Sequence, residues 1–397
     1  MKKTKLIHDM NLVFPACVVK EKELYSITDV EKIFMKIDIE SGKVNYIDNP
    51  HGYIPSKWTG TDGILYNDGK LYCFEQNGER VMECLLNENK CRYIDIHCNK
   101  YVCSNFASYI IYENKLYIFP SFLHKVIKID LTLGNIEKEE EFCTEIEYIY
   151  EKEGYDGFGA QIPCKLFSCG CQVGCSMWLF TEKSQRVIEF NLKTEKYMVY
   201  EIPKEIKGCI HAIYKDNLFY ILSIEGNVYS WNSRENTICE VVKFECDMRY
   251  PYFGKIVVTN NKVWMLPNFG QDIWVKNTKT GELIKYSNYP NEFNYHNLSG
   301  WSKYYTCTED CENYYFSMHV ANYILSIQKE TGDERWIKPI VPPLKEKYEF
   351  YKKNKWGVID ERGGSLMSFI NSLDFELNRD EDKEKMIGCN FIWKNIK

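Results

Sequence analysis

The stretch "NKLYIFPSFLHKVIKIDLTLGN", residues 114–135, decides the fold because its spacing recurs along the chain. Leu116 opens one apolar run, Val126 opens a second run ten residues later, and Gly134 stands at a turn eighteen residues after Leu116. The same offsets start from six other positions, which are Leu24, Leu71, Met177, Leu218, Val263 and Tyr314. Most of the turn positions are Gly or Asn, the residues that tolerate a left-handed backbone. The chain therefore contains seven copies of one unit.

Each copy reads as four short strands. In the third copy these are "SYIIY", "KLYIF", "VIKIDL" and "IEKEEEF", and the apolar Ile127, Ile129 and Leu131 alternate with polar residues. A four-stranded sheet with two apolar faces cannot bury them alone, whereas a closed ring of such sheets can. The sequence therefore predicts an all-β protein, a seven-bladed β-propeller of four-stranded antiparallel blades over residues 1–340.

The spacing between copies supports this architecture. The seven starting positions are 41 to 61 residues apart and mostly near 45, which fits one propeller blade. A β-sandwich is the alternative, and seven matching sets of offsets disfavour it. The sixth copy departs from the pattern because Lys276 stands where the others mostly place an apolar residue, so we expect a β-bulge there.

Two of the copies resemble a known propeller repeat. "KIDIESGKVNYI" at residues 36–47 and "SIQKETGDERWI" at residues 326–337 are similar to the PQQ-like repeat, in which an aliphatic strand leads to a Thr-Gly turn and an outward strand. The resemblance spans roughly residues 12–340. It implies a propeller and no particular chemistry, since many activities use this fold. No cofactor is therefore expected.

Two segments lie outside the repeats. Residues 141–168 account for the longest spacing and form an insert loop between the third and fourth blades. Residues 341–397 follow the last blade as a short C-terminal helical extension. "SLMSFINSLDF" at residues 365–375 has an apolar stripe at helical spacing, so we expect a helix there, packed on the propeller.

Composition limits the class of partner and the compartment. The 397 residues carry a net charge of -6, which argues against a nucleic-acid binder. No window approaches 18 apolar residues, and the first residues lack the apolar core of an export signal, so neither a membrane partner nor secretion is expected. The 17 cysteines should then be free thiols in a reducing cytoplasm.

The connections between blades are the predicted binding surface. The turns between first and second strands, and between third and fourth strands, are short and repetitive, whereas the inter-blade connections are long and dissimilar. Loops without a structural constraint carry sites on rigid scaffolds. We expect a protein, peptide, glycan or other small-molecule ligand on this face. The candidate surface consists of His51, Trp58, Asp62, Asn105, His211, Arg249, Tyr252, His296 and Trp301. In the alternative interpretation, these aromatic residues pack loops onto blades and the histidines are solvated.

An enzyme is the second interpretation, because some propeller lyases and hydrolases use a histidine base at the mouth of the central channel. His211 and His296 would be the candidate bases, with Asp62 as their partner and a divalent metal as an optional assistant. The chain contains no nucleophile elbow, phosphate-binding loop or zinc-protease motif. Binding is therefore the preferred function.

A run of cysteines, "CKLFSCGCQVGC", gives a third and weaker interpretation as a redox or metal sensor. It contains Cys164, Cys169, Cys171 and Cys175, and thiolates of this kind can hold zinc or an iron–sulfur cluster. The spacing of Cys169 and Cys171 is too tight for the usual chelating pair. Strand alternation instead places these two thiols on one face as small core residues.

Overall fold

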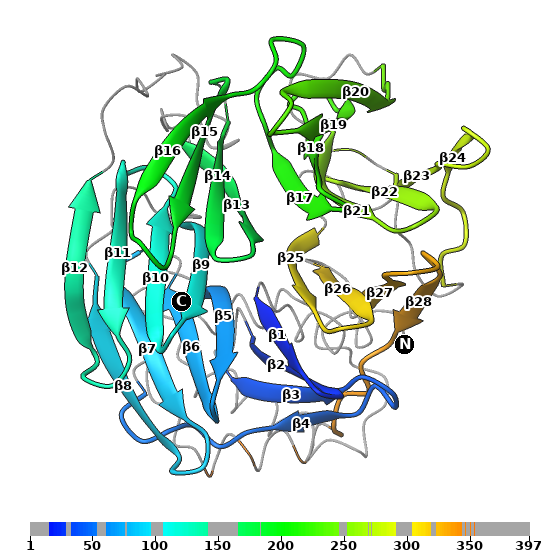
Figure 1. The fold of residues 1–397 in the computed structure, drawn as a ribbon. Coiled ribbons are helices and arrows are strands. Elements are labelled where there is room, and N and C mark those ends of the chain that lie inside the picture. Colours follow the sequence, from blue (N-terminus) through cyan, green and yellow to red (C-terminus); the bar gives the residue numbers. More distant parts are fainter. Residues whose placement is uncertain are drawn as a thin grey trace, which may run out of the picture.

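The protein is a ring of seven sheets, each built from four consecutive antiparallel strands (Figure 1). The computed structural model describes residues 16–28, 33–53, 61–75, 78–96, 106–141, 166–182, 184–245, 252–268, 270, 272–290, 304–318, 323–343, 346, 350 and 353. The predicted seven-bladed β-propeller is confirmed. Among the described residues no helix is long and apolar enough to cross a membrane.

The strands follow one another from the centre of the ring to its rim in every blade. Blade 1 has β1 (Cys17–Lys20), β2 (Glu23–Ile27), β3 (Phe34–Asp38) and β4 (Val44–Tyr46); blade 2 has β5 (Thr61–Asn67), β6 (Lys70–Glu75), β7 (Arg80–Leu85) and β8 (Lys90–Asp95); blade 3 has β9 (Phe106–Tyr112), β10 (Lys115–Pro120), β11 (Lys125–Asp130) and β12 (Asn135–Glu141); blade 4 has β13 (Phe167–Val173), β14 (Ser176–Thr181), β15 (Arg186–Asn191) and β16 (Tyr197–Glu201). Blade 5 has β17 (His211–Lys215), β18 (Leu218–Leu222), β19 (Val228–Asn232) and β20 (Thr237–Val242); blade 6 has β21 (Phe253–Val258), β22 (Lys262–Pro267), β23 (Trp274–Asn277) and β24 (Leu283–Lys285); blade 7 has β25 (Tyr304–Glu309), β26 (Asn313–Met318), β27 (Ile324–Gln328) and β28 (Glu334–Ile337).

The turn before the outermost strand is left-handed in every blade, at the positions that the repeat predicts. The residues with positive φ at these positions are Gly42, Asn89, Gly134, Glu195, Asn236, Gly281 and Gly332. Glu195 is neither Gly nor Asn, so it adopts this conformation less readily. Its carboxylate accepts hydrogen bonds from Lys128 and Lys138 of blade 3. This contact between blades explains why an acidic residue occupies the turn.

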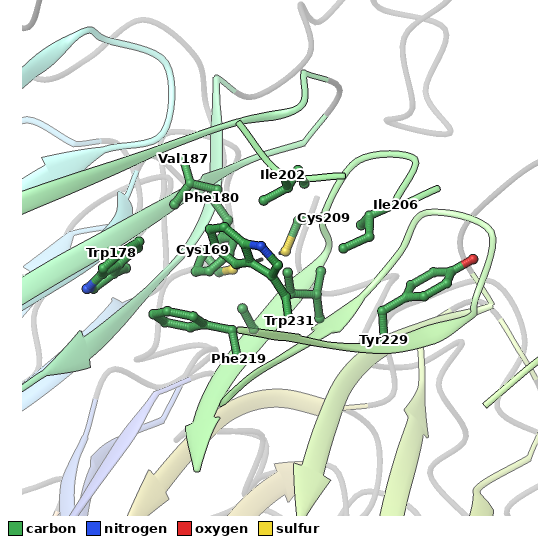
Figure 2. Close-up of a cluster of buried hydrophobic side chains, with 12 residues drawn as sticks. Cys169, Trp178, Phe180, Val187, Ile202, Ile206, Cys209, Phe219, Tyr229 and Trp231 are labelled. Atoms are coloured by element: carbon green, nitrogen blue, oxygen red, sulfur yellow. Dashed lines mark hydrogen bonds between the residues drawn. The ribbon is translucent and has the colours of Figure 1, made fainter. Parts of the chain in front are cut away.

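Apolar side chains fill the spaces between neighbouring blades. At the junction of blades 2 and 3, the ring of Tyr109 on β9 stacks on Phe74 of β6, with centroids 4.1 Å apart. Gly63 of β5 permits this contact, because a Cβ at that position would overlap the Tyr109 hydroxyl. At the junction of blades 4 and 5, Phe180 meets Phe219 in an edge-to-face contact within a larger aromatic cluster (Figure 2). Each blade therefore buries its faces against the next one.

Among the described residues, the sheets of blades 7 and 1 each consist of four consecutive strands, and the two blades meet through side-chain and backbone contacts. The backbone N–H of Val19 on β1 donates to the Thr308 hydroxyl on β25, at 3.1 Å. Residues 338–340, the closing strap, then lie along the outer strand of blade 1. There Val44 N–H donates to the Ile340 carbonyl (3.1 Å) and Ile340 N–H donates to the Gly42 carbonyl (2.7 Å). These contacts close the ring.

The same arrangement occurs at the junction of blades 1 and 2, which are consecutive in the chain. Residues 51–52, the first strap, lie along β8 in a parallel bridge. The N–H of His51 donates to the Asn89 carbonyl at 2.8 Å, and Cys91 N–H donates to the His51 carbonyl at 2.9 Å. The closing strap thus repeats the arrangement found between blades 1 and 2.

The bulge expected in the sixth blade is not present in the pairing of β22 with β23. Lys276 lies opposite Val263 in a regular register, the same register that β14 and β15 use. The Lys276 ammonium reaches the carbonyl oxygen of Gly281 at 2.5 Å, so a long cationic side chain occupies the position without shifting the strand.

The described part of the C-terminal extension contacts blade 1. Glu346, Phe350 and Lys353 are helical. The Phe350 ring lies 5.3 Å from that of Tyr46, and the Lys353 ammonium lies 2.6 Å from the Asp48 carboxylate. The helix expected near residues 365–375 and most of the insert at 141–168 fall outside the residues that the structure describes, so both stay predictions.

Candidate binding surface

The candidate surface is only partly within the described residues. His51, Asp62, His211 and Tyr252 are described. Trp58, Asn105, Arg249, His296 and Trp301 lie outside them. Asp62 and His211 lie on inner strands, His51 lies at the rim, and Tyr252 lies at a blade junction. Each of the four has a contact within the fold.

His211 lies at the start of β17, the innermost strand of blade 5, and contacts the neighbouring blade. Its Nδ1 atom accepts a hydrogen bond from the backbone N–H of Ile256 on β21, at 3.4 Å. Burial, assisted by the positive charge of Lys255, lowers the pKa of His211 to about 3. The imidazole is therefore neutral near pH 7, and with so low a pKa it is a weak general base.

Asp62 and His211 belong to different parts of the ring. Asp62 is on β5, the innermost strand of blade 2, and blades 3 and 4 separate it from blade 5 along the ring. Burial and the charge of Asp62 together raise the pKa of Tyr109. The two residues that were predicted to act together thus lie on blades that are not neighbours.

His51 and Tyr252 are positioned by the edges of blades. The first strap holds His51 at the rim of blade 2, beside the β7–β8 turn, where its side chain is exposed. The Tyr252 ring packs against Phe244 and Phe253, with centroids 5.1 and 4.7 Å away. Gly270 leaves room for that ring, because a Cβ there would overlap it. His51 is thus separated from the inner strands, and Tyr252 supports the blade 5–6 junction.

The three described cysteines of the run each have different hydrogen-bond partners. Cys169 and Cys171 lie on β13, and each thiol accepts a backbone N–H from β17, those of Ala212 and Tyr214 respectively. Cys175 is in the following turn, where the Asn191 amide donates to its sulfur at 3.6 Å. Cys164 lies outside the described residues. In the part of the chain that the structure describes, no three Cys, His, Asp or Glu side chains are placed to hold a metal ion.

Sequence reasoning missed how the inner strands use polar side chains. The His211 imidazole, the Thr308 hydroxyl and the thiol of Cys171 each accept an N–H from the inner strand of the next blade. Such groups satisfy donors that face the neighbouring sheet rather than a strand of their own sheet. It also missed the contact between Cys169 and Cys209, because nothing in the sequence near Cys209 marks it as part of a motif.

Comparisons with known proteins support the fold and nothing finer. No protein-family model matches the chain, and no curated protein is significantly similar to it. Among solved structures it is similar to the computationally designed Ika8 protein, with a TM-score of 0.50 and 9% identity over 83% of this chain and 87% of that one.

A second similar structure is PorZ of Porphyromonas gingivalis, an essential bacterial surface component of the type-IX secretion system. Its TM-score is 0.51 at 10% identity, over 84% of this chain and 39% of PorZ, so the chain spans about two fifths of that protein. Identities this low concern the fold alone. The fold and the comparisons together define the class: this is a seven-bladed β-propeller protein.

Proposed function

We propose that the protein is a cytoplasmic binding or scaffold propeller, built from PQQ-like repeats, that recognises a protein, peptide, glycan or other small molecule through its inter-blade connections. The observation that carries this proposal is that described side chains of types common in catalysis accept hydrogen bonds from the backbone. His211 and Cys171 each accept a backbone N–H across a blade junction. These groups therefore support the scaffold, and the long connections remain as the variable part of the chain.

The scaffold is suited to presenting such connections. Neighbouring blades are joined by apolar clusters, and some junctions also have a hydrogen bond between inner strands, so loops attached to the blades start from rigid positions. Trp58, Trp301 and Arg249 are the residue types that most often anchor an interface. We expect them to supply most of the binding free energy.

Charge favours the kind of partner proposed, and thiol chemistry fits the compartment. A net charge of -6 disfavours nucleic acid and anionic membrane surfaces. The proposed reducing cytoplasm would keep the 17 cysteines of the chain as thiols. Neither argument identifies the ligand, so the experiment begins with a screen.

The test uses the purified full chain against a glycan array and a displayed peptide library, followed by affinity measurements on the strongest ligand. Replacing Trp58 and Trp301 together with Ala should weaken binding at least about tenfold, because central aromatic anchors cost more than 1 kcal/mol each when truncated. Leu133 is the control, since it is 69% exposed in the β11–β12 turn, among the short turns. The proposal fails if Leu133→Ala weakens binding as much as the double variant does.

A further inference from the structure

The thiols of Cys169 and Cys209 lie side by side at the junction of blades 4 and 5. Their Sγ atoms are 3.9 Å apart and share a hydrogen bond (Figure 2). Cys169 comes from β13, the inner strand of blade 4, and Cys209 from the connection that leads into β17 of blade 5. Both belong to the apolar cluster between the two blades. A bond between these sulfurs would therefore join two blades.

The backbone around Cys209 is fixed, so the pair is held together by the fold. Cys209 N–H donates to the Thr181 carbonyl at the end of β14 (3.2 Å), and the next N–H, of Ile210, donates to the Leu222 carbonyl (2.8 Å). Gly208 has a positive φ of 66°, and a Cβ on it would overlap the carbonyl oxygen of Glu182. Only a glycine lets the segment approach β14 this closely.

The two thiols differ in their surroundings. Cys169 is 7% exposed; it shares a hydrogen bond with the Cys209 thiol and accepts hydrogen bonds from the Ser168 hydroxyl and the Ala212 N–H. Cys209 is fully buried. The hydrogen bond with Cys209 is the main cause that lowers the pKa of Cys169, while burial raises the pKa of Cys209. Both thiols are buried, and Cys169 is the one whose pKa is lowered, so it is the one that ionises more readily.

We propose that Cys169 and Cys209 form a reversible redox staple, in which hydrogen peroxide converts the thiol pair into a disulfide between blades 4 and 5. The Cys169 thiolate attacks one peroxide oxygen, the O–O bond breaks, and hydroxide leaves to become water on taking up a proton. The resulting sulfenic acid is attacked by the Cys209 sulfur, the S–O bond breaks, and the Cys209 proton leaves with the oxygen as a second water. Two thiols and one peroxide give one disulfide and two waters.

A second thiol group in blade 2 provides an internal comparison. Cys84 and Cys91 lie directly opposite each other on β7 and β8. The N–H of Cys91 points away from β7, to His51, so this is a non-hydrogen-bonded pair, the kind in which side chains are closest. Hydrogen bonding with neighbouring thiols raises the pKa of both. Neither thiol is therefore an early nucleophile, and we expect Cys169 to react before either of them.

The experiment oxidises the purified full chain with a stoichiometric amount of hydrogen peroxide, blocks remaining thiols and maps tryptic peptides without reduction. The peptide of residues 208–215 contains Cys209 alone, and the peptide of residues 166–183 contains Cys169, Cys171 and Cys175. The expected product joins these two peptides, with fragmentation placing the link at Cys169, and a dithiol reductant separates them. This measurement needs no variant and so no assumption about folding.

Three variants assign the roles of the two sulfurs. Cys209→Ala should abolish the link and let a sulfenic acid accumulate at Cys169, where a dimedone-type probe traps it. Cys169→Ala should leave Cys209 unmodified. Cys171→Ala, two residues along the same strand, should form the link at the wild-type rate. The proposal is overturned if the oxidised wild-type chain carries no bond between Cys169 and Cys209, or if the blade 2 thiols are oxidised first.

Discussion

Blades 1 and 2 carry the same three side chains at equivalent positions, with the charges exchanged. In blade 1 the Lys36 ammonium lies 2.6 Å from the Glu23 carboxylate, which also accepts from the Tyr25 hydroxyl. In blade 2 the acid is Glu83 of β7, and it accepts from Lys70 (2.9 Å) and from the Tyr72 hydroxyl (3.2 Å). Tyr25 lies opposite Lys36 in the sheet, as Tyr72 lies opposite Glu83.

The two sites differ in their third neighbour, on the outermost strand. Arg92 of β8 lies opposite Glu83 and donates to its second oxygen, whereas Asn45 of β4 lies opposite Lys36. The Glu83 side chain is 1% exposed, while that of Glu23 is 36% exposed. A second cation thus compensates the burial of a carboxylate, and without one the pair stays at the surface.

The largest expected loss of stability comes from removing the buried carboxylate of blade 2. Glu83→Gln should lower the free energy of unfolding by about 3 kcal/mol, because it removes charge-assisted hydrogen bonds from a buried position and leaves two cations without their acid. Urea denaturation, followed by tryptophan fluorescence, measures the change. The matched variant Glu23→Gln should cost only about 0.5 kcal/mol, as exposed ion pairs do. Equal losses in the two variants would show that burial does not distinguish the sites.

The next effect concerns the straps, which the two blades also share. Gly42→Ala should cost about 2–3 kcal/mol, because φ is +74° and the new Cβ would overlap the Lys338 carbonyl oxygen of the closing strap. Gly281 is the control, since it has the same φ within a degree and open space around its Cβ. Gly281→Ala should therefore cost only the backbone strain, about 1 kcal/mol. If both variants have the same urea midpoint, the closing strap adds nothing to stability.

Acid should weaken blade 2 in a way that depends on Glu83. Burial opposes ionisation of this carboxyl, but hydrogen bonds from Arg92 and Lys70 outweigh it and hold its pKa below the ordinary value of 4.5. A depressed pKa stabilises the folded state above that value, and the stabilisation disappears as pH falls through the folded pKa. The gap in stability between wild type and Glu83→Gln should therefore narrow below about pH 4.5. A gap that widens toward acid would contradict the assignment.

The smallest expected effect comes from a substitution that gives the ion pair of blade 1 a third charged residue, as in blade 2. Asn45→Glu places an acid opposite Lys36, so that one lysine has two carboxylates as Glu83 has two cations. We expect a gain of about 0.5 kcal/mol, read as a higher urea midpoint at low salt that shrinks in concentrated salt. Asn45→Gln is the uncharged control. A loss of stability would mean that repulsion between the acids outweighs the new ion pair.

The fold was predictable because the repeat indicates both the strand positions and the turn positions. The offset of ten residues gives Phe34, Val81 and Val126, which are the first or second residues of the third strands, and the offset of eighteen locates the left-handed turns. Both reflect local backbone geometry, which a sequence pattern records directly. Lys276 misled the prediction of a bulge because a long side chain can keep its register while moving its charge outward.

The site was much less predictable, since it depends on contacts between segments far apart in the sequence. His211 was chosen as a base for its residue type, yet its environment lowers its pKa and Ile256 occupies its Nδ1 atom. His51 was grouped with the other histidines because it follows a blade, but a parallel bridge holds it beside Lys90 at the rim. Neither partner can be identified from local sequence.

The closing strap has a consequence for how rings of this kind change in size. Every sheet is made from consecutive strands, and the joint between blades 7 and 1 repeats the contacts of the joint between blades 1 and 2. Tandem duplication or loss of one gene segment would thus add or remove an intact wedge without splitting any sheet. The remaining blades would only have to share the full circle at a different angle, because the described residues of blades 7 and 1 meet through the same kind of strap that joins blades 1 and 2.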